Sequence, residues 1–382
     1  MTYLCKPVRS ALITILLLAT LAGCNTEYQR VLKSTDQDFK YQKALEYYEN
    51  EQFFKAIPIF EELMSLGKGT QSMEDIYYYY CMAQYGQRNY IIAAYHFKEY
   101  VQRFPFDDRA EEALFLHAEC YEKQSPGVSL DQTNTIKAIE AYQTFINAYP
   151  DGDRVAETND RIEALRDKLE AKSLRAADLY YRTKNYRAAA ISYRNLLIDY
   201  PDIENAEEIQ FKIVFSYDRY ADLSVLSKQS ERYADVISAG DDFLSRYPDS
   251  EQAGEVQDLI DRSHFRVIES ALAYARTLPP AERPAQLEEV RNLYTVHVES
   301  LGPARSAQAD ELYEASVFED VQAWFDVAQA ETERTEKIDA YQHTVDAYYD
   351  YNTRYADGEH QKDARKLYDS AIKNLNKMDQ NG

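Results

Sequence analysis

The sequence predicts an all-α chain: a right-handed solenoid of about five helical hairpins, followed by a helical C-terminal extension. A helical pattern closes four times with an aromatic residue and a proline, the aromatic residues being Phe104, Tyr149, Tyr200 and Tyr247. Fourteen residues before each closure the same frame begins, at Tyr90, Thr135, Tyr186 and Tyr233. The chain has few β-branched runs and lacks Asn-Gly or Asp-Gly turns between alternating strands, which disfavours β structure.

The frame is typical of the second helix of a tetratricopeptide hairpin. A small or β-branched residue stands three positions into it, where two helices cross closely, and seven positions in stands an aromatic residue or glycine. The proline after the helix end cannot continue the helix. The residues concerned are Ala93, Ala138, Ala189 and Val236 at the third position, and Phe97, Tyr142, Tyr193 and Gly240 at the seventh.

Residues 1–23 have the features of an export signal. Lys6 and Arg9 precede an apolar run over 11–22 that ends in Leu-Ala-Gly followed by Cys24. This run is shorter than the roughly 20 residues that cross a bilayer. The four residues resemble the lipobox of bacterial lipoproteins, which implies lipidation of Cys24; an ordinary signal peptide with a cysteine at its cleavage site is the alternative. Asn25, in place of the aspartate that retains lipoproteins in the inner membrane, favours a lipid anchor in the outer membrane, facing the periplasm.

We expect residues 24–38 to be a lipidated tether and 39–265 to be the repeat solenoid. The first hairpin runs through Ala44 and Tyr47 to a frame that starts at Phe53 and lacks the closing proline. Frame spacings exceed the basic unit of about 34 residues. The excess is expected in an inserted loop over 125–134 and in a long charged helix over 153–184.

Residues 266–382 are expected to form the helical extension, with one further hairpin near the end. Tyr341, Tyr348 and Tyr355 repeat the frame spacing without a closing proline. The segment 363–378 would then cover the last apolar face, as solenoids require.

The charge of the chain excludes several partners. Its formal net charge is −22, and loss of Lys6 and Arg9 with the signal would make it −24. Nucleic acid is therefore not expected as a partner, because phosphate contacts need a basic face. Attraction to anionic lipid through charge alone is disfavoured for the same reason.

The sequence shows no pattern that carries catalysis. The 6 histidines are scattered without a His-Glu-x-x-His pair, and nucleotide-binding glycine loops and nucleophile elbows are missing. We therefore expect neither an enzyme nor a metal or other cofactor. Cys81 and Cys120 lie in helical patterns and are expected to be buried free thiols, with a disulfide as the alternative.

Tyrosine is unusually frequent, at 34 of 382 residues. Most rings are expected to fill helix crossings with their hydroxyls in water. Some are expected to line a groove that holds peptide segments, because tyrosine offers a large contact area at low entropic cost. Tyr47, Tyr78 and Tyr85 are our candidates for this groove.

The repeats resemble those of the BamD family of lipoproteins, which belong to the outer-membrane β-barrel assembly (BAM) machinery. The resemblance covers about residues 21–250 and is carried by 161–169, 177–181, 186–190 and 199–202. It implies a non-enzymatic periplasmic scaffold that binds the periplasmic domains of a BamA-like barrel and unfolded β-barrel substrates.

The resemblance also implies where the barrel partner would bind. The family carries a partner-binding basic residue in the fourth-hairpin helix, at the position of Ser192. Arg194 lies two residues further along, roughly on the opposite face of the helix, so it cannot be assumed to replace that basic residue. The candidates for this contact are Tyr180, Tyr181, Tyr193 and Arg194.

Two other functions agree with parts of the sequence. A tetratricopeptide adaptor for cell-wall enzymes would share the anchor and the repeats. A glycan-binding lipoprotein of the SusD type is also helical and rich in aromatic residues, but it would be longer and carry several exposed tryptophans, whereas this chain has only Trp324.

Overall fold

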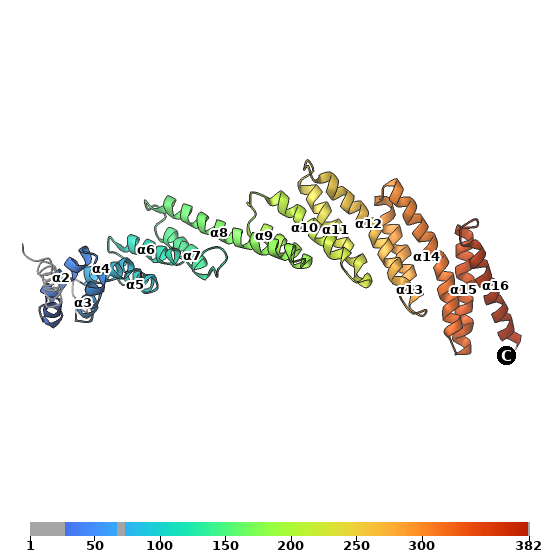
Figure 1. The fold of residues 1–382 in the computed structure, drawn as a ribbon, viewed down its shortest axis with the longest axis horizontal. Helices are drawn as coiled ribbons and strands as arrows, with labels where there is room; N and C mark the ends of the chain where they lie inside the picture. The colour runs from blue at the N-terminus through green and yellow to red at the C-terminus, as the bar shows by residue number, and fades with distance from the viewer. Residues whose placement is uncertain (1–26, 67–72, 381–382) are drawn as a thin grey trace, which may run out of the picture. The chain divides into compact units, whose positions relative to one another are not determined.

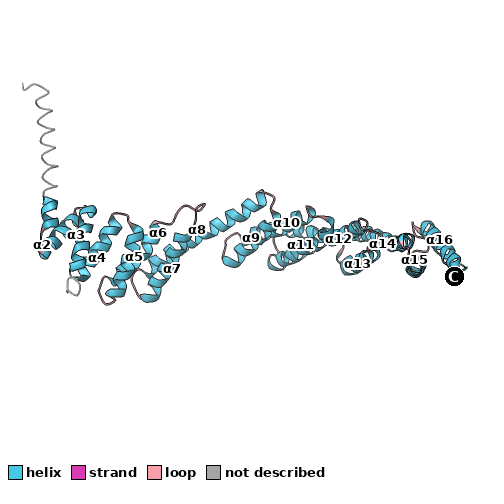
Figure 2. Ribbon diagram, turned by 90° about the horizontal axis from the view of Figure 1, so that it is seen from below, coloured by secondary structure: helices cyan, strands magenta, loops and turns pink. Residues whose placement is uncertain are grey.

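The computed structural model describes residues 27–66 and 73–380, and every regular element within these ranges is a helix (Figures 1 and 2). Residues 27–33 are helical. The helices that follow are α2 (Gln37–Glu49), α3 (Phe53–Leu66), α4 (Met73–Gly86), α5 (Tyr90–Arg103), α6 (Ala110–Lys123), α7 (Thr133–Ala148), α8 (Val155–Arg182), α9 (Tyr186–Asp199), α10 (Ala206–Asp222), α11 (Leu226–Arg246), α12 (Ala253–Ala275), α13 (Arg283–His297), the 3-10 helix η1 (Val298–Ser300), α14 (Pro303–Ala330), α15 (Arg334–Arg354) and α16 (Gln361–Gln380). The predicted all-α solenoid is confirmed.

The chain divides into two compact units. Unit 1 extends to Lys172 and unit 2 begins at Ser173, so the division falls within α8. In unit 1, α2 to α7 pack each against the next around a core rich in aromatic residues. In unit 2, α9 to α12 surround a second core, and α12 to α16 pack around smaller apolar clusters.

The frame positions make the cores, as expected. Ala56, Ala93, Ala138 and Ala189 are all fully buried, because a methyl group is what fits where two helices cross closely. The aromatic residues at the seventh position are buried as well: they are Phe60, Phe97, Tyr142 and Tyr193. Helices α3, α5, α7, α9 and α11 are the second helices of the five predicted hairpins.

Each aromatic-proline pair ends a helix in the same backbone conformation. Phe104, Tyr149, Tyr200 and Tyr247 cap their helices with φ between −128° and −132°. A following proline disfavours the α conformation, which explains the shared ending. Tyr355 ends α15 at φ −132° and ψ 55° although alanine follows it, so the fifth closure needs no proline.

Three tight turns inside hairpins share one motif. Glu51, Arg88 and Lys184 have positive φ values of 56°, 64° and 61°. At Arg88, the backbone N–H bonds to Tyr85 O at 2.9 Å, and the next N–H, of Asn89, bonds to Gln84 O at 3.0 Å. The other two turns repeat this pattern, which is the Schellman ending of a helix.

The structure also differs from expectation. Residues 27–33, expected within the tether, are helical, and the Val31 side chain is fully buried because it packs into the first core. The expected boundary at 265 falls inside the continuous helix α12, whose apolar residues pass from one cluster to the next between Val267 and Ile268. Among the described helices, none has the length and apolar character that crossing a bilayer requires.

Candidate partner-binding surfaces

The first helices of successive hairpins in unit 1 are linked side chain to side chain. Three polar contacts join α4 to α6 and to Arg109, the residue just before α6, and each spans 34 sequence positions. The bonds run from Arg109 to Asp75 at 2.7 Å, from Tyr78 to Glu112 at 2.7 Å and from Tyr85 to Glu119 at 2.8 Å. A constant separation means that α4 and α6 are parallel and in register. We call the surface of α2, α4 and α6 the A-helix face.

Tyrosine hydroxyls on the A-helix face stay protonated. Burial, and then the charge of Asp75, raise the pKa of Tyr41 to about 12. Burial also raises the pKa of Tyr78 and Tyr85, and their bonds to glutamates raise it further. A neutral hydroxyl that donates to a carboxylate makes a strong hydrogen bond. These contacts therefore hold successive hairpins together.

The three predicted groove tyrosines occupy different environments. Tyr47 and Tyr78 are each only 8% exposed, so their expected place in an open groove is corrected: they are core residues. Tyr47 packs edge-on against Tyr28, with ring centroids 5.8 Å apart. Tyr85 is half-buried, and Glu119 holds its hydroxyl.

Besides Tyr85, the A-helix face has part-exposed rings that the sequence pattern did not single out. Tyr41, Tyr48 and Tyr79 are half-buried, and the rings of Tyr48 and Tyr79 lie 5.3 Å apart. All three lie outside the repeating frame, so their exposure depends on how the first helices stack.

Unit 2 carries a basic and aromatic surface around the start of α9. A pocket of about 470 Å³ opens there, and its lining includes Lys184, Tyr186, Arg187, Ile191 and Tyr220. Beside it, the Arg194 guanidinium lies 5.3 Å from the Tyr217 ring centroid, and that of Arg232 lies 4.1 Å from the Tyr220 ring centroid. We call this pocket with Arg194, Tyr217 and Arg232 the α9 patch.

Asp235 is the carboxylate that the arginines of the α9 patch approach. Burial raises the pKa of Asp235, and the charges of Arg194, Arg187 and Arg232 oppose that rise. Arginines lie over aromatic rings elsewhere in the chain too, for example Arg154 and Arg161 over Phe115, but the α9 patch joins such contacts to an open pocket. Such a surface suits an acidic partner, because the arginines can donate to carboxylates while the rings contribute apolar area.

The predicted partner residues lie near this patch but are not equally accessible. Tyr180 is 42% exposed and Arg194 is exposed. Tyr181 is half-buried, with its ring centroid 5.5 Å from that of Tyr186. Tyr193 is fully buried, and its hydroxyl donates to Asp178 Oδ1 at 2.5 Å. The expectation that the Tyr193 ring touches a partner is corrected, because the ring fills the seventh frame position of α9.

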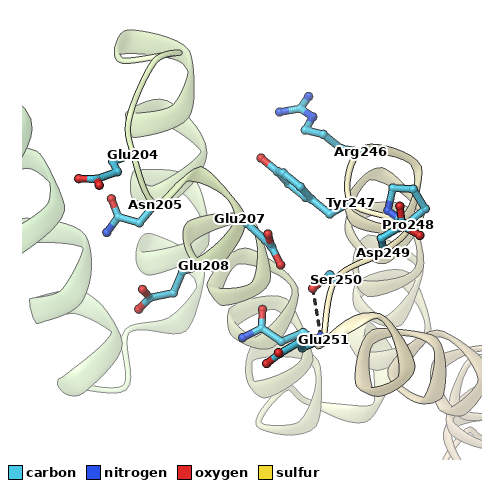
Figure 3. A pocket seen from close by; sticks show the side chains of 11 residues that line it. Glu204, Asn205, Glu207, Glu208, Arg246, Tyr247, Pro248, Asp249, Ser250 and Glu251 are labelled. Atoms are coloured by element: carbon cyan, nitrogen blue, oxygen red, sulfur yellow. Dashed lines mark hydrogen bonds between the residues drawn. The ribbon is translucent and has the colours of Figure 1, made fainter.

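A second opening in unit 2 is acidic. A cleft of about 840 Å³ lies between the turn before α10 and the turn before α12, and Figure 3 shows the side chains that line it. Its charged lining comprises Glu204, Glu207, Glu208, Arg246, Asp249 and Glu251. Three of the acids follow closely on aromatic-proline closures, Glu204 after Pro201 and Asp249 and Glu251 after Pro248, and this is the sequence signal that could have located the cleft. Its excess of carboxylates would attract basic groups.

The remaining predictions concern cysteines and metals. Cys24 lies outside the described residues. Cys81 and Cys120 are buried free thiols. Burial raises the pKa of the Cys120 thiol to about 12, which makes it a poor nucleophile. Across 27–66 and 73–380, no three histidine, cysteine or carboxylate side chains gather as metal ligands would.

Comparison with protein families decides what kind of chain this is. The family model described as YfiO, outer membrane lipoprotein, matches residues 33–230, which is more than half of the chain. The chain belongs to this family. The matched residues include the A-helix face and the start of α9.

Two curated relatives agree with this family. The outer membrane protein assembly factor BamD of Caulobacter vibrioides is 23% identical over 118 residues, and the putative BamD of Aquifex aeolicus is 23% identical over 207 residues. The matches cover 31% and 54% of this chain, and 39% and 67% of those proteins. The resemblance to BamD in the sequence is thus confirmed at the level of the family.

Solved tetratricopeptide structures also align over much of the chain. The TPR2AB domain of yeast Sti1, in a complex with pHSP90, aligns at a TM-score of 0.29 and 13% identity, covering 73% of this chain and 98% of that one. A tetratricopeptide repeat protein from Parabacteroides merdae aligns at a TM-score of 0.25 and 11% identity, covering 88% of this chain and 98% of that one.

Proposed function

We propose that the protein is a lipid-anchored scaffold that helps to assemble β-barrel proteins in the outer membrane, with its anchor at Cys24. Membership of the outer membrane lipoprotein family supports this, as do the assembly-factor relatives. The repeats support a binding role, because stacked hairpins present extended surfaces to other chains. The protein would act by holding partners and would carry out no chemistry itself.

The α9 patch is the proposed docking site for a BamA-like barrel protein. The observation that carries this is the gathering of Arg187, Arg194 and Arg232 around the buried Tyr217 ring and the part-exposed Tyr220 ring in an acidic chain. The partner would present carboxylates there. The part-exposed rings of the A-helix face, Tyr41, Tyr48 and Tyr79, would hold unfolded barrel segments.

The docking site is tested by reversing its charge. The double variant Arg187→Glu/Arg194→Glu is expected to bind the barrel partner about 10-fold or more weakly, since removing close interfacial charges costs several kcal/mol. The measurement is co-purification of the membrane complex by a C-terminal tag, followed by titration of the purified components.

Arg246→Glu is the matched control. It makes the same Arg→Glu reversal at one exposed residue of unit 2, in the acidic cleft, which is half the charge change of the double variant, and it should leave partner binding unchanged. If the tagged protein brings down no barrel protein under conditions that preserve membrane complexes, the scaffold proposal fails. Recovery of cell-wall hydrolases in its place would assign the adaptor function.

A further inference from the structure

One edge of unit 1 collects the turns inside its hairpins. The contacts of α4 with α6 make these helices parallel, and α2 lies parallel to α4, with Tyr41 close to Asp75 and Tyr48 against Tyr79. The C-terminal ends of the three helices therefore meet on one side. We call this side, with the turns 50–52 and 87–89 and the loop 124–132, the turn edge.

The turn edge exposes apolar side chains. Phe54, Ile91 and Ile136 each stand one position after the frame start, and they are 63%, 77% and 48% exposed. Ile92 is 44% exposed and Leu130, in the loop 124–132, is 62% exposed. Large apolar side chains gathered on one side of a protein mark an interaction surface.

The chain enters the fold at the same edge. Lys43 Nζ donates to Glu27 Oε1 at 2.8 Å, and the Tyr28 ring packs on Tyr47, two residues before the end of α2. Glu27 therefore lies near the turn that leads to Phe54. Three residue steps separate Cys24 from Glu27, and they reach at most about 11 Å. A lipid on Cys24 would therefore hold Glu27, and with it this side of unit 1, close to the bilayer.

Charge also separates the turn edge from the opposite edge. Lys55, Arg88 and Lys137 stand beside the exposed apolar residues, although Glu51 and Asp131 lie there too. Phe106, on the opposite edge, is 98% exposed, but Asp107 and Asp108 follow it, and Asp151 and Asp153 lie in the next turn on that side. Arg109 pairs with Asp107, and Arg154 follows Asp153, so both edges carry mixed charge, with more carboxylates on the opposite edge. Mixed charge around apolar groups suits the lipid interface, whereas an excess of carboxylates is repelled by anionic headgroups.

We propose that the turn edge of unit 1 rests on the lipid surface, with Phe54, Ile91 and Leu130 inserted among the headgroups. The proposal depends on the lipid anchor at Cys24 that belongs to the proposed function. It adds a second attachment, which would fix the orientation of the first hairpins toward the bilayer. A single flexible anchor would leave that orientation free.

The test places a fluorophore on each edge of the full-length lipidated protein. Ile91→Cys and Phe106→Cys are labelled with an environment-sensitive dye, while the buried thiols Cys81 and Cys120 stay unlabelled. Each protein is reconstituted into vesicles of phosphatidylethanolamine and phosphatidylglycerol that contain brominated lipid. We expect a blue shift and quenching at position 91, and neither at position 106.

A second variant checks that the apolar residues cause this effect. Phe54→Asp/Leu130→Asp, added to the labelled Ile91→Cys protein, should abolish quenching while the protein still floats with the vesicles. Equal quenching at positions 91 and 106 in floating vesicles would overturn the turn-edge proposal and leave the anchor intact.

Two other outcomes overturn the proposal in different ways. If the wild-type protein does not float with vesicles, the anchor fails and the turn-edge proposal falls with it. If position 91 becomes shielded without vesicles, to a degree that rises with protein concentration, then a second copy of the chain covers the edge.

Discussion

Gly240 shows how one side chain sets the distance between two helices. It stands at the seventh frame position of α11, where the other hairpins carry an aromatic residue. A Cβ atom there would lie 2.5 Å from Ile260 Cγ1 and 2.8 Å from Ile260 Cδ1. Any larger residue would therefore have to displace the Ile260 side chain of α12, which fills the space that a ring occupies elsewhere.

We predict that Gly240→Ala destabilises unit 2 by about 1–2 kcal/mol. Overpacking costs about 1–3 kcal/mol, and the gain in helix propensity offsets less than about 1 kcal/mol of it. Hydrogen exchange of α11 and α12 measures the effect. Gly254→Ala is the control: a Cβ at Gly254 meets no atom within 4 Å, so that variant should be neutral or stabilising. Equal protection in the two variants would show that α12 moves without cost.

Single tyrosines at the helix crossings both fill the core and hydrogen-bond to a neighbouring helix. Tyr142 and Tyr193 are fully buried, and each hydroxyl donates to a carboxylate at the margin of the core, Glu122 and Asp178 respectively. The ring supplies buried area, and the hydroxyl fixes the neighbouring helix. This double use explains why a chain with so much tyrosine has so few of those rings free for partners.

At the scale of the element, the helix endings share the backbone conformation of their last aromatic residue more consistently than they share a following proline. Five helices end in one backbone geometry, at Phe104, Tyr149, Tyr200, Tyr247 and Tyr355. Proline follows the first four of these residues. At Tyr355 the same geometry occurs before Ala356. The aromatic side chain, packed on the last turn of its helix, is thus compatible with the ending whether or not proline follows.

We predict that Ala356→Pro is tolerated and stabilises the end of α15 by about 0.4–1 kcal/mol, because proline restricts the unfolded chain without straining a compatible native conformation. Hydrogen exchange of α15 measures this. Ala347→Pro, in the interior of the same helix, should cost about 3 kcal/mol or more. Destabilisation by Ala356→Pro would mean that the residue after Tyr355 differs in conformation from the prolines of the other closures.

At the scale of the whole molecule, buried tyrosine makes stability depend on alkaline pH. Burial is the first cause that raises the pKa of Tyr41 and Tyr80 in unit 1, and of Tyr294 in unit 2, from 10.0 to about 12. The folded state therefore favours the neutral phenol. The contribution to stability is complete below pH 10, the unfolded value, and is lost as the pH rises to about 12.

We predict that the free energy of unfolding falls progressively from pH 10 to about pH 12. We also predict that the phenolate absorbance of the buried tyrosines appears only when the protein unfolds. Denaturant titrations at several pH values, with parallel ultraviolet spectra, measure both. Tyr80→Phe should flatten the dependence. A constant free energy of unfolding over this range would contradict the prediction.

The sequence predicts helices and loops better than individual binding residues, because the patterns that specify helices and loops are local. A break in the repeat predicts the inserted loop, which appears as the loop 124–132. Helical periodicity predicts the long helix over 153–184, which appears as α8. Individual binding residues were harder. Tyr78 and Tyr79 are neighbours in a run of four tyrosines, yet only Tyr79 remains part-exposed, because the adjacent helices decide which side of α4 is covered.

The sequence by itself determined the helical class, the positions of the hairpins and the way each helix ends. Those properties follow from the period of the apolar residues and from backbone conformation, which act over a few residues. Only the tertiary structure decided that Tyr47, Tyr78 and Tyr193 are buried, that arginines and rings gather in the α9 patch, and that the chain enters the fold at the edge where Phe54 and Ile91 are exposed. Burial and proximity depend on residues more than 30 positions apart, and only the packed helices bring them together.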